Sequence, residues 1–385
     1  MPSLLIVTTV APTLRAFLLP FARHYRALGW RVEAAARDIN DVPALQAEFD
    51  ACHALPLSRN PLDLGALLRA PAAIRRLVGS GDYDLVHVHT PVAAMLLRFA
   101  LRGRPDGARP RVVYTAHGFH FHRHGRALTN AVFRTAERLA APWCDALVTI
   151  NREDHDAARA AGFATRVEYM PGIGVDTARW NPAQVEAATV AALRQALGLR
   201  DADVLFLMVA EFNPGKRHRD VLAALGQPGL EHVHVAFAGD GPLRPALEVE
   251  AMTAGIGGRA HFLGFRRDIA ALMRASRAVL LPSQREGLPR SLLESLSMAV
   301  PIIGADIRGI RELAENDCGR LHAVGDVAGL AAALRELAAA PDLAAAMGAR
   351  GRERMLRDYD EKVVIRLHDE LYADLLKDRD AEATS

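Results

Sequence analysis

The stretch Ala278–Glu294, with the sequence AVLLPSQREGLPRSLLE, contains the three parts from which the whole chain is built. An apolar run ends near Leu281, a loop follows, and Pro289 stands where the first residue of a helix is expected. A short strand that is apolar throughout is typical of a parallel sheet covered on both faces. The stretch therefore predicts one strand–loop–helix unit.

The same unit recurs along the chain in two series. The first series predicts strands at Leu4–Val10, Arg31–Ala35, Leu85–His89, Val112–Ala116 and Ala146–Ile150, and the second at Val204–Val209, Val233–Ala238, His261–Leu263, Ala278–Leu281 and Pro301–Gly304. The helices expected between them are Thr13–Leu28, Leu62–Val78, Val92–Leu101, Leu128–Ala140, Asp220–Leu225, Leu243–Ala254, Ile269–Ala275, Pro289–Met298 and Val327–Ala340. Two such series predict an α/β chain with two doubly wound, Rossmann-like domains that face a cleft.

The boundary between the two domains is expected near Met170–Gln184, where prolines and glycines gather. We place the N-terminal domain at residues 1–175 and the C-terminal domain at 176–360. Residues 361–385 form a final amphipathic helix that is expected to pack back toward the N-terminal domain.

The composition is that of a soluble globular protein. The chain has 385 residues, of which 50% are apolar and 24% charged, and its net charge is +2. These values exclude a disordered or coiled-coil chain, and no apolar run approaches the length of a membrane span. The first apolar run has no basic residue before it, and the three cysteines form no pairs in sequence. We therefore expect a cytoplasmic location.

Charge is distributed unevenly between the two halves. Residues 1–180 carry 22 arginines and 16 acidic residues, whereas residues 181–385 carry 25 basic and 29 acidic residues. A basic first half is suited to an anionic partner such as phosphate or an anionic membrane surface, or it reflects an arginine-rich proteome. Nucleic acid is not expected as a partner, because no zinc-finger or RNA-binding motif is present.

Glu286 and Glu294 are the first candidates for a site. Ligands of doubly wound domains bind at the carboxyl ends of the strands, where loops meet helix N-termini. Glu286 lies in such a loop, and the amides from Gly287 to Arg290 belong to a helix end suited to an anion. The alternative is that Glu294 merely pairs with Arg290 one helical turn away, while Glu286 is solvated.

Lys216 follows another predicted strand, after the turn Asn213–Gly215. A lysine at this place can bind a phosphate as a point charge, although an isolated lysine is often only a surface residue. The turn Gly239–Pro242 follows the next strand. Neither the GxGxxG dinucleotide motif nor the P-loop motif occurs, which disfavours a site of either kind.

Four histidines and two arginines lie between His117 and Arg126. His117 directly follows a strand and is expected to act in the cleft as a hydrogen-bond donor or a base. The rest of the loop is suited to a phosphate-bearing substrate. Metal binding is the alternative, but no cysteine or carboxylate pair supports it. The segments Asp82–Asp84 and Asp201–Asp203 match a DxD metal motif by letter, yet each precedes a strand instead of following one.

These motifs together resemble the retaining glycosyltransferases of the GT-B fold, family 4. The resemblance rests on Ser283-x-x-Glu286-Gly-Leu-Pro-x-x-x-x-Glu294, on Pro301–Leu313, on Gly239-Asp-Gly-Pro and on Gly172-Ile-Gly-Val-Asp176. The segment His117-Gly-Phe-His120-Phe is similar to the branch that builds bacterial capsule, exopolysaccharide and lipid-linked oligosaccharides. The likeness runs from end to end, with the motifs in the family's order.

The resemblance implies roles for individual residues. Glu286 contacts hydroxyl groups of the donor sugar, Lys216 neutralises the diphosphate leaving group, and His117 touches the transferred sugar. The remaining donor-binding residues are Glu294 on the ribose, Gly287, Leu288, Pro289 and Arg290 on the sugar and diphosphate, and Gly264, Phe265 and Arg266 around the base. We expect His120, Arg123 and Arg126 to bind the acceptor. No metal and no cofactor are implied.

Two positions depart from the family's pattern. Glu211 stands where many members have an arginine that pairs with the lysine on the diphosphate, so Lys216 and the helix amides must contribute more. The exopolysaccharide branch shares this glutamate. The glycine-rich first loop of many members is replaced by Thr8–Thr13.

The resemblance implies a hexosyltransferase-type enzyme. It moves a hexose or an N-acetylhexosamine from a nucleotide-sugar, with UDP expected, to a polysaccharide or polyprenyl-diphosphate-linked saccharide, with retention of configuration. Peripheral contact with the anionic inner face of the cytoplasmic membrane is also expected. The alternatives are a UDP-sugar 2-epimerase on the same fold and a non-catalytic sugar-nucleotide-binding partner subunit. A hydrolase with paired carboxylates is disfavoured, because Glu286 and Glu294 have roles on the nucleotide side.

Overall fold

The computed structural model describes residues 1–58, 60, 63–103, 109–121 and 125–384. The chain divides into two compact units, of which unit 1 comprises Met1–Ile173 and Lys362–Ser385, and unit 2 comprises Gly174–Glu361. The chain thus enters unit 2 once and leaves it once. Both crossings lie close together, because a β-carbon on Gly174 would lie 2.5 Å from the α-carbon of Glu361.

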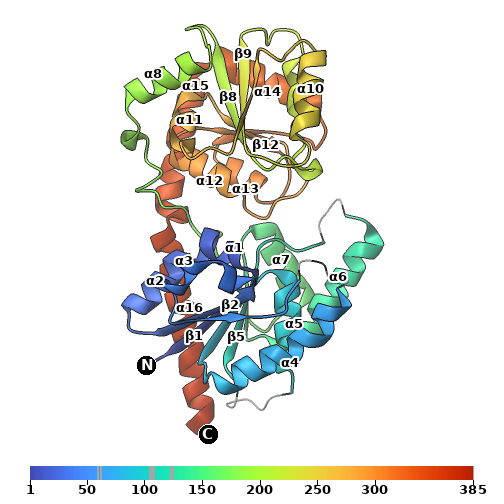
Figure 1. Ribbon diagram of the computed structural model, residues 1–385, viewed down its shortest axis with the longest axis vertical. Coiled ribbons are helices and arrows are strands. Elements are labelled where there is room, and N and C mark those ends of the chain that lie inside the picture. Colours follow the sequence, from blue (N-terminus) through green and yellow to red (C-terminus); the bar gives the residue numbers. More distant parts are fainter. Residues whose placement is uncertain (59, 61–62, 104–108, 122–124, 385) are drawn as a thin grey trace. The chain divides into compact units, whose positions relative to one another are not determined.

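Figure 1 shows the sheet of unit 1 with its covering helices. The sheet has seven parallel strands in the order β3-β2-β1-β4-β5-β6-β7. The strands are β1 (Ser3–Val10), β2 (Arg31–Arg37), β3 (Ala51–Ala54), β4 (Leu85–His89), β5 (Arg111–Ala116), β6 (Ala146–Thr149) and β7 (Val167–Tyr169). The helices that cover it include α1 (Ala11–Thr13), a π-helical segment (Leu14–Leu18), α2 (Leu19–Ala27), α3 (Pro43–Gln46), α4 (Leu64–Ser80), α5 (Pro91–Leu101), α6 (Ala127–Ala140), α7 (Arg152–Ala161) and α16 (Glu361–Thr384).

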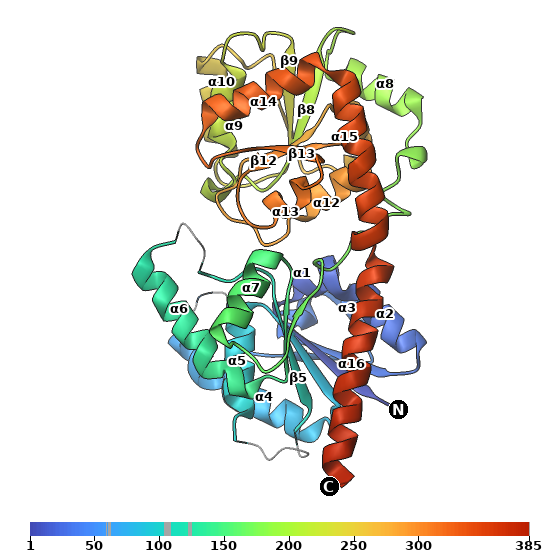
Figure 2. The same ribbon diagram turned by 180° about the vertical axis from the view of Figure 1, so that it is seen from behind.

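The two faces of this sheet carry separate cores. In β1, Leu5 and Val7 belong to a cluster that includes side chains of α4 and α5. Leu4 and Ile6 belong to the other cluster, which includes side chains of α2 and α16. Because successive strand residues point to opposite faces, a strand between two helical layers is apolar at every position. Figure 2 shows α16 running along the sheet of unit 1.

Unit 2 has a six-stranded parallel sheet with the order β10-β9-β8-β11-β12-β13. The strands are β8 (Val204–Val209), β9 (Val233–Ala238), β10 (Ala260–Gly264), β11 (Val279–Leu281), β12 (Ile302–Ala305) and β13 (Gly319–His322). The helices include α8 (Ala187–Ala196), α9 (His218–Leu225), α10 (Arg244–Thr253), α11 (Ile269–Ala275), α12 (Arg290–Ser297), α13 (Ile310–Ala314), α14 (Val327–Ala339) and α15 (Pro341–Arg354). The prediction of two doubly wound α/β sheets is confirmed.

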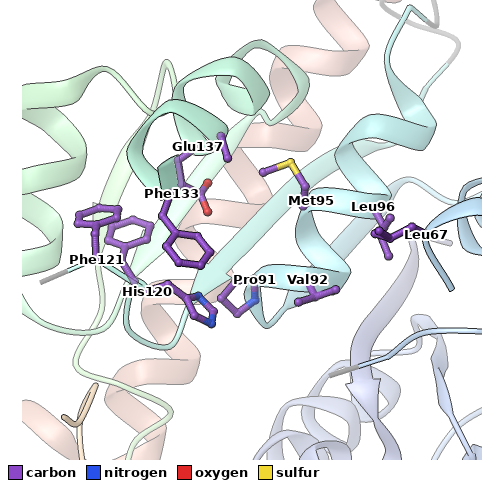
Figure 3. Close-up of a pocket in the computed structure, with 11 residues that line it drawn as sticks. Leu67, Pro91, Val92, Met95, Leu96, His120, Phe121, Phe133 and Glu137 are labelled. Carbon is purple, nitrogen blue, oxygen red and sulfur yellow. The ribbon is translucent and has the colours of Figure 1, made fainter. Parts of the chain in front are cut away.

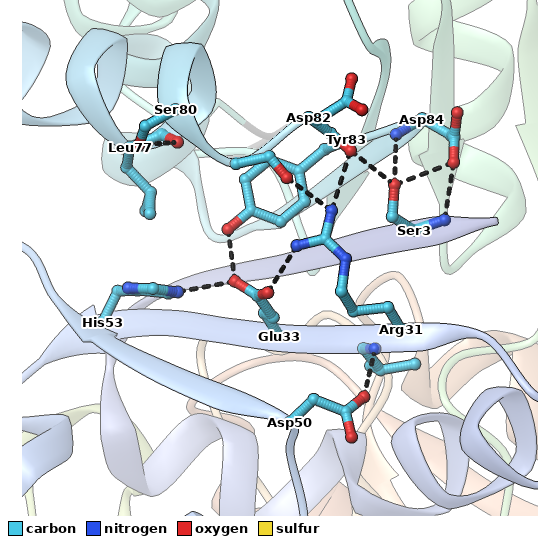
Figure 4. A network of polar contacts seen from close by, with 12 residues as sticks. Ser3, Arg31, Glu33, Asp50, His53, Leu77, Ser80, Asp82, Tyr83 and Asp84 are labelled. Atoms are coloured by element: carbon cyan, nitrogen blue, oxygen red, sulfur yellow. Dashed lines mark hydrogen bonds and ion pairs between the residues drawn. The ribbon is translucent and has the colours of Figure 1, made fainter. Parts of the chain in front are cut away.

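A polar network closes the amino-terminal edge of the sheet in unit 1 (Figure 4). The Glu33 carboxylate accepts hydrogen bonds from Tyr83 at 2.5 Å and from Arg31 at 2.6 Å. Asp84 accepts from the backbone amide of Ser3 at 2.7 Å. The DxD segment Asp82–Asp84 therefore lies at the edge opposite to the one where doubly wound folds bind ligands.

Candidate active site

The loops after β8 and β11 meet in unit 2. These two strands are neighbours in the sheet, although β9 and β10 lie between them in the sequence, so the strand order reverses between β8 and β11. The backbone amide of Gln284 donates to the carbonyl oxygen of Gly215 at 3.0 Å and joins the two loops. Ligands of doubly wound sheets bind outside such a switch point.

Lys216 and Glu286 form an ion pair at this switch point. The Lys216 Nζ lies 2.5 Å from Glu286 Oε1, and the two side chains are 26% and 13% exposed. Lys216 ends a 3₁₀ turn (Pro214–Lys216) after β8, and Glu286 lies in the loop between β11 and α12. The two residues are 70 positions apart in sequence, so only the strand order brings them together. The pair is a partly exposed cation next to a hydrogen-bond acceptor, which suits a ligand with phosphate and hydroxyl groups.

Glu294 lies on α12 and is buried. Its Oε1 accepts from Arg290 Nε at 2.8 Å, so the helix-face pairing considered from the sequence does occur. Burial raises the pKa of the Glu294 carboxyl to about 7, against the opposing effect of Arg290 and Arg179. A carboxyl group that is partly protonated near neutral pH is poised to change its charge when a ligand binds.

Pro289 is the residue before α12 and not its first residue. Its ψ of 120° is extended, and the helix begins at Arg290. Proline has no backbone N–H group, so Pro289 itself cannot donate a hydrogen bond to an anion. The backbone amides of the residues around Pro289 are the donors available at this helix end. The prediction that Pro289 is the first helical residue is wrong by one position.

Glycine is required where the neighbouring loop packs against Glu286. Gly309 has a φ of +71°, and a β-carbon there would lie 1.9 Å from the carbonyl oxygen of Gly287. The Nε of Arg308 donates to the carbonyl oxygen of Glu286 at 3.3 Å. The segment before α13 thus fixes the loop that carries Glu286, which is the structural reason for the glycine in the Pro301–Leu313 motif.

Gly264, Phe265 and Arg266 lie at the end of β10, two strands away from β8. The Gly264 carbonyl oxygen accepts from the amide of Gly239 at 2.8 Å, which places this segment beside the turn after β9. Arg266 pairs with Asp268, and the ring of Phe265 is 79% exposed. An exposed aromatic ring at the carboxyl end of a parallel sheet is a surface on which a base can stack.

Glu211 is exposed in the loop after β8. Its carboxylate accepts from the side-chain amide of Asn213 at 3.1 Å, while Lys216 is paired with Glu286. The glutamate that departs from the family's pattern therefore does not form the ion pair with Lys216.

His117 lies at the carboxyl end of β5 in unit 1 and is joined to a chain of buried histidines. Its Nε2 is hydrogen-bonded to His89 Nδ1 at 3.0 Å. The ring of His89 stacks on that of His87 with centroids 4.1 Å apart, and His87 is hydrogen-bonded to Tyr372 on α16. Burial, with a smaller effect of His368, lowers the pKa of His117 to about 4. His117 is therefore a neutral imidazole at neutral pH.

Thr90, the residue that follows β4, has a strained backbone beside this chain. Its φ is +76°, which β-branched residues rarely adopt. Its hydroxyl is hydrogen-bonded to that of Thr9 at 2.6 Å. β1 and β4 are the strands between which the order of this sheet reverses. The segment Thr8–Thr13 is not a loop, because β1 extends to Val10 and α1 begins at Ala11. The hydroxyls of Thr9 in β1 and of Thr90 after β4 meet at the switch point of unit 1.

Two of the three proposed acceptor residues, His120 and Arg126, lie in the part of the chain that the structure describes. His120 stacks on Phe133 of α6 with ring centroids 4.8 Å apart, and Arg126 is the exposed residue before α6. Arg123, His122 and His124 lie outside the described residues. His117 thus belongs to the histidine chain, whereas His120 and Arg126 lie next to α6.

Within the described ranges, no group of three histidine, cysteine or acidic side chains is arranged to hold a metal ion. The second DxD segment has a structural role, because Asp203 pairs with Arg200 at 2.8 Å. The described helices include none that is long and apolar enough to cross a membrane.

Comparisons with known proteins give consistent matches over both units. The model "Glycosyltransferase Family 4" matches residues 16–179, and "Glycosyl transferases group 1" matches residues 190–354. The protein EpsD of Bacillus subtilis (strain 168), which carries a glycosyltransferase name, is 31% identical over 373 residues, covering 95% of each chain. The UDP-Gal:alpha-D-GlcNAc-diphosphoundecaprenol alpha-1,3-galactosyltransferase of Escherichia coli is 28% identical over 258 residues, covering 65% of each chain.

Solved structures agree on the fold. The crystal structure of Anabaena Alr3699/HepE in complex with UDP matches with a TM-score of 0.78 and 19% identity, covering 97% of this chain and 100% of that one. The fold is that of a GT-B glycosyltransferase, and the chain is a transferase. It belongs to glycosyltransferase family 4.

Proposed function

We propose that the chain transfers a hexose or an N-acetylhexosamine from a UDP-sugar to a polyprenyl-diphosphate-linked or polysaccharide acceptor, with retention of configuration. The observation that carries this proposal is the Lys216–Glu286 pair at the switch point of unit 2. The E. coli relative, which by its name uses UDP-galactose and a diphosphoundecaprenol-linked acceptor, supports the choice of substrates.

In the proposed reaction the bond between the anomeric carbon and the diphosphate oxygen breaks, and UDP leaves. The acceptor hydroxyl oxygen forms the new bond on the same face, and its proton passes to the leaving phosphate. Negative charge develops on that phosphate oxygen, where Lys216 and the amides at the start of α12 stabilise it. One preorganised donor of this kind is typically worth about 2.7–4 kcal/mol.

The remaining roles are proposed from the family resemblance, and the position and charge of each residue support them. Glu286 accepts hydrogen bonds from hydroxyl groups of the donor sugar, and Glu294 accepts them from the ribose. His117, neutral at the pH of the cytosol, hydrogen-bonds a hydroxyl group of the sugar rather than supplying a positive charge. We propose that no divalent cation is needed, so a chelator should leave the rate unchanged.

A thermal-shift panel of UDP-, GDP- and ADP-sugars tests the donor class. A ligand at 100 times its dissociation constant stabilises the folded state by about 2.7 kcal/mol. We expect UDP-sugars alone to raise the melting temperature. Stabilisation by GDP-sugars or ADP-sugars instead would mean that the nucleotide of the donor carries guanine or adenine and not uracil.

The raised pKa of Glu294 predicts pH-dependent binding of UDP. The folded chain holds this proton up to about pH 7, whereas ribose hydroxyl groups bind best to the ionised carboxylate. Affinity should therefore rise with pH, by up to about tenfold per unit below pH 7. UDP itself titrates in this range, so the measurement is the ratio of dissociation constants for the unmodified chain and Glu294→Gln, by calorimetry at about pH 6 and about pH 8. A ratio of dissociation constants that does not change with pH would contradict the proposed contact between Glu294 and the ribose.

The basic unit 1 leads us to propose reversible contact with an anionic membrane. Each arginine near anionic lipid contributes about 1 kcal/mol, within about one Debye length. The chain should therefore sediment with anionic liposomes at low salt and remain in solution at high salt. Arg126→Glu/Arg134→Glu in unit 1 should abolish sedimentation, whereas Arg219→Glu/Arg357→Glu in unit 2 changes the charge equally and should not. Equal loss of sedimentation in both double variants would mean that net charge alone causes the binding to liposomes.

Two other functions remain distinguishable by assay. A UDP-sugar 2-epimerase would convert the donor without an acceptor, and a non-catalytic subunit would bind the donor without turnover. Transfer is favoured over epimerisation because the sequence offers no motif for the additional acid–base carboxylates that an epimerase needs.

A further inference from the structure

Unit 1 contains an apolar cavity that the donor chemistry does not use. Its volume is about 170 Å³. It is lined by Leu67, Pro91, Val92, Met95, Leu96, Phe119, His120, Phe121, Phe133, Ala136 and Glu137 (Figure 3). Glu137 is the one acidic side chain of this lining, and its carboxylate is paired with the buried Arg98 at 2.7 Å. The walls are thus suited to an apolar ligand.

The helices that supply the walls also expose large apolar side chains. On α4, which carries Leu67, Leu64 and Leu68 are 72% and 79% exposed. On α6, which carries Phe133, Leu128 and Val132 are 79% and 59% exposed. Apolar side chains gathered on the surface around an apolar cavity mark a binding surface more often than chance exposure does.

Cationic side chains accompany these apolar ones. Arg126 is exposed directly before α6, and Arg134 of α6 lies over the ring of Phe121, 5.1 Å from its centroid. A surface with an apolar cavity and nearby arginines complements a ligand that is apolar at one end and anionic next to it.

The cavity is connected in sequence to His117. His120, in its wall, is three residues after His117, so their α-carbons are at most about 11 Å apart. A ligand that reaches from His117 to the cavity therefore passes from a polar site to an apolar one within a short distance. Lipid-linked saccharides have this order of parts: sugar, diphosphate, then a hydrocarbon chain.

We propose that this cavity holds the first isoprene unit of the acceptor's polyprenyl chain, with Arg126 on the adjacent diphosphate. This inference rests on the proposed function and specifies the acceptor class. An apolar cavity of about 150 Å³ can hold a benzene molecule, so the volume is adequate for a branched unit of five carbons. The rings of His120 and Phe133, side by side in Figure 3, form one wall against such a branched chain.

Calorimetric titration of the full chain with geranyl diphosphate tests the proposal. Pyrophosphate and octyl phosphate serve as probes without the prenyl chain. We expect geranyl diphosphate to bind at least about tenfold more tightly than pyrophosphate, because burial of several methylene groups is sufficient for that factor. Ala136→Trp, which fills the cavity from α6, should reduce the affinity to that for pyrophosphate.

Matched variants separate occupancy of the cavity from damage to the fold. Ala131→Trp adds the same side chain to the exposed face of α6 and should retain tight binding. Val92→Phe fills the cavity from α5 and should repeat the effect of Ala136→Trp. Stabilisation of each variant by UDP reports on unit 2 and on the proposed function separately.

Three results would overturn the inference. The first is tight binding of geranyl diphosphate by both filled variants. The second is equal affinity of the unmodified chain for geranyl diphosphate and pyrophosphate. The third is equal affinity for geranyl diphosphate and octyl phosphate, which would assign the cavity to a linear lipid chain. If UDP does not stabilise the unmodified chain, that result would instead contradict the proposed function.

Discussion

Replacement of Glu286 by glutamine is expected to reduce turnover by roughly a hundredfold or more while UDP still binds. The loop between β11 and α12 holds Glu286 at the switch point, and its carboxylate is the acceptor proposed for hydroxyl groups of the donor sugar. A sugar that is held out of position by about 1 Å can lose about 10²-fold in rate. UDP has no donor sugar, so its affinity should not fall. It should rise modestly, since Lys216 is then released from its ion pair.

The measurement combines steady-state turnover with calorimetric titration of UDP. Glu248→Gln is the matched control, because Glu248 is an exposed glutamate in the same unit that pairs with Arg244 at 2.8 Å. It should leave both quantities unchanged. Turnover of Glu286→Gln within a few-fold of the unmodified chain would remove Glu286 from the reaction.

Replacement of Lys216 by methionine is expected to weaken UDP and UDP-sugar binding together. A hydrogen bond to a charged group is worth about 1.5–3 kcal/mol, which corresponds to a loss of affinity of about 10–150-fold. Since Glu211 stands where many family members have a second cation, nothing at that position compensates. Turnover should fall further, because charge on the leaving phosphate increases in the transition state.

Lys377→Met is the control for Lys216→Met. It removes the same charge from the exposed part of α16 in unit 1 and should change neither binding nor rate. The double variant Lys216→Met/Glu286→Gln should bind UDP as weakly as Lys216→Met alone, since the partner pair no longer exists. Unchanged UDP affinity in Lys216→Met would move the diphosphate site away from this loop.

The strands at the centre of both sheets could be predicted from the sequence, but three edge strands could not. β3, β7 and β13 have the sequences ACHA, VEY and GRLH, and each lies at the edge of its sheet. An edge strand is covered less completely than a central one, so it lacks the continuous apolar run by which the others were found. α7 was also missed, although its signal was present: Asn151 caps it by accepting from the amide of Asp154 at 2.8 Å.

The residues of the candidate site could be predicted from the sequence, but the contacts between them could not. His117 was identified because it directly follows a predicted strand, and Lys216 and Glu286 because they lie in loops that follow predicted strands. Their partners depend on strand order and on distant segments, which local patterns do not encode. The chain passes through β9 and β10 before β11 pairs with β8, and His87 is hydrogen-bonded to Tyr372, 285 residues later. The histidine chain behind His117 therefore became visible only in the folded unit.

The central claim is that this single chain transfers a sugar from a UDP-sugar to an acceptor. The most direct test is the release of UDP by the purified chain from UDP-galactose, UDP-glucose and their N-acetyl forms, with and without a prenyl-diphosphate-linked N-acetylglucosamine. The account predicts UDP release that requires the acceptor, a glycosylated product with retained configuration, and release that is slower by roughly a hundredfold or more in Glu286→Gln. Conversion of the donor without acceptor, or binding of UDP-sugars with no turnover on any acceptor, would contradict it.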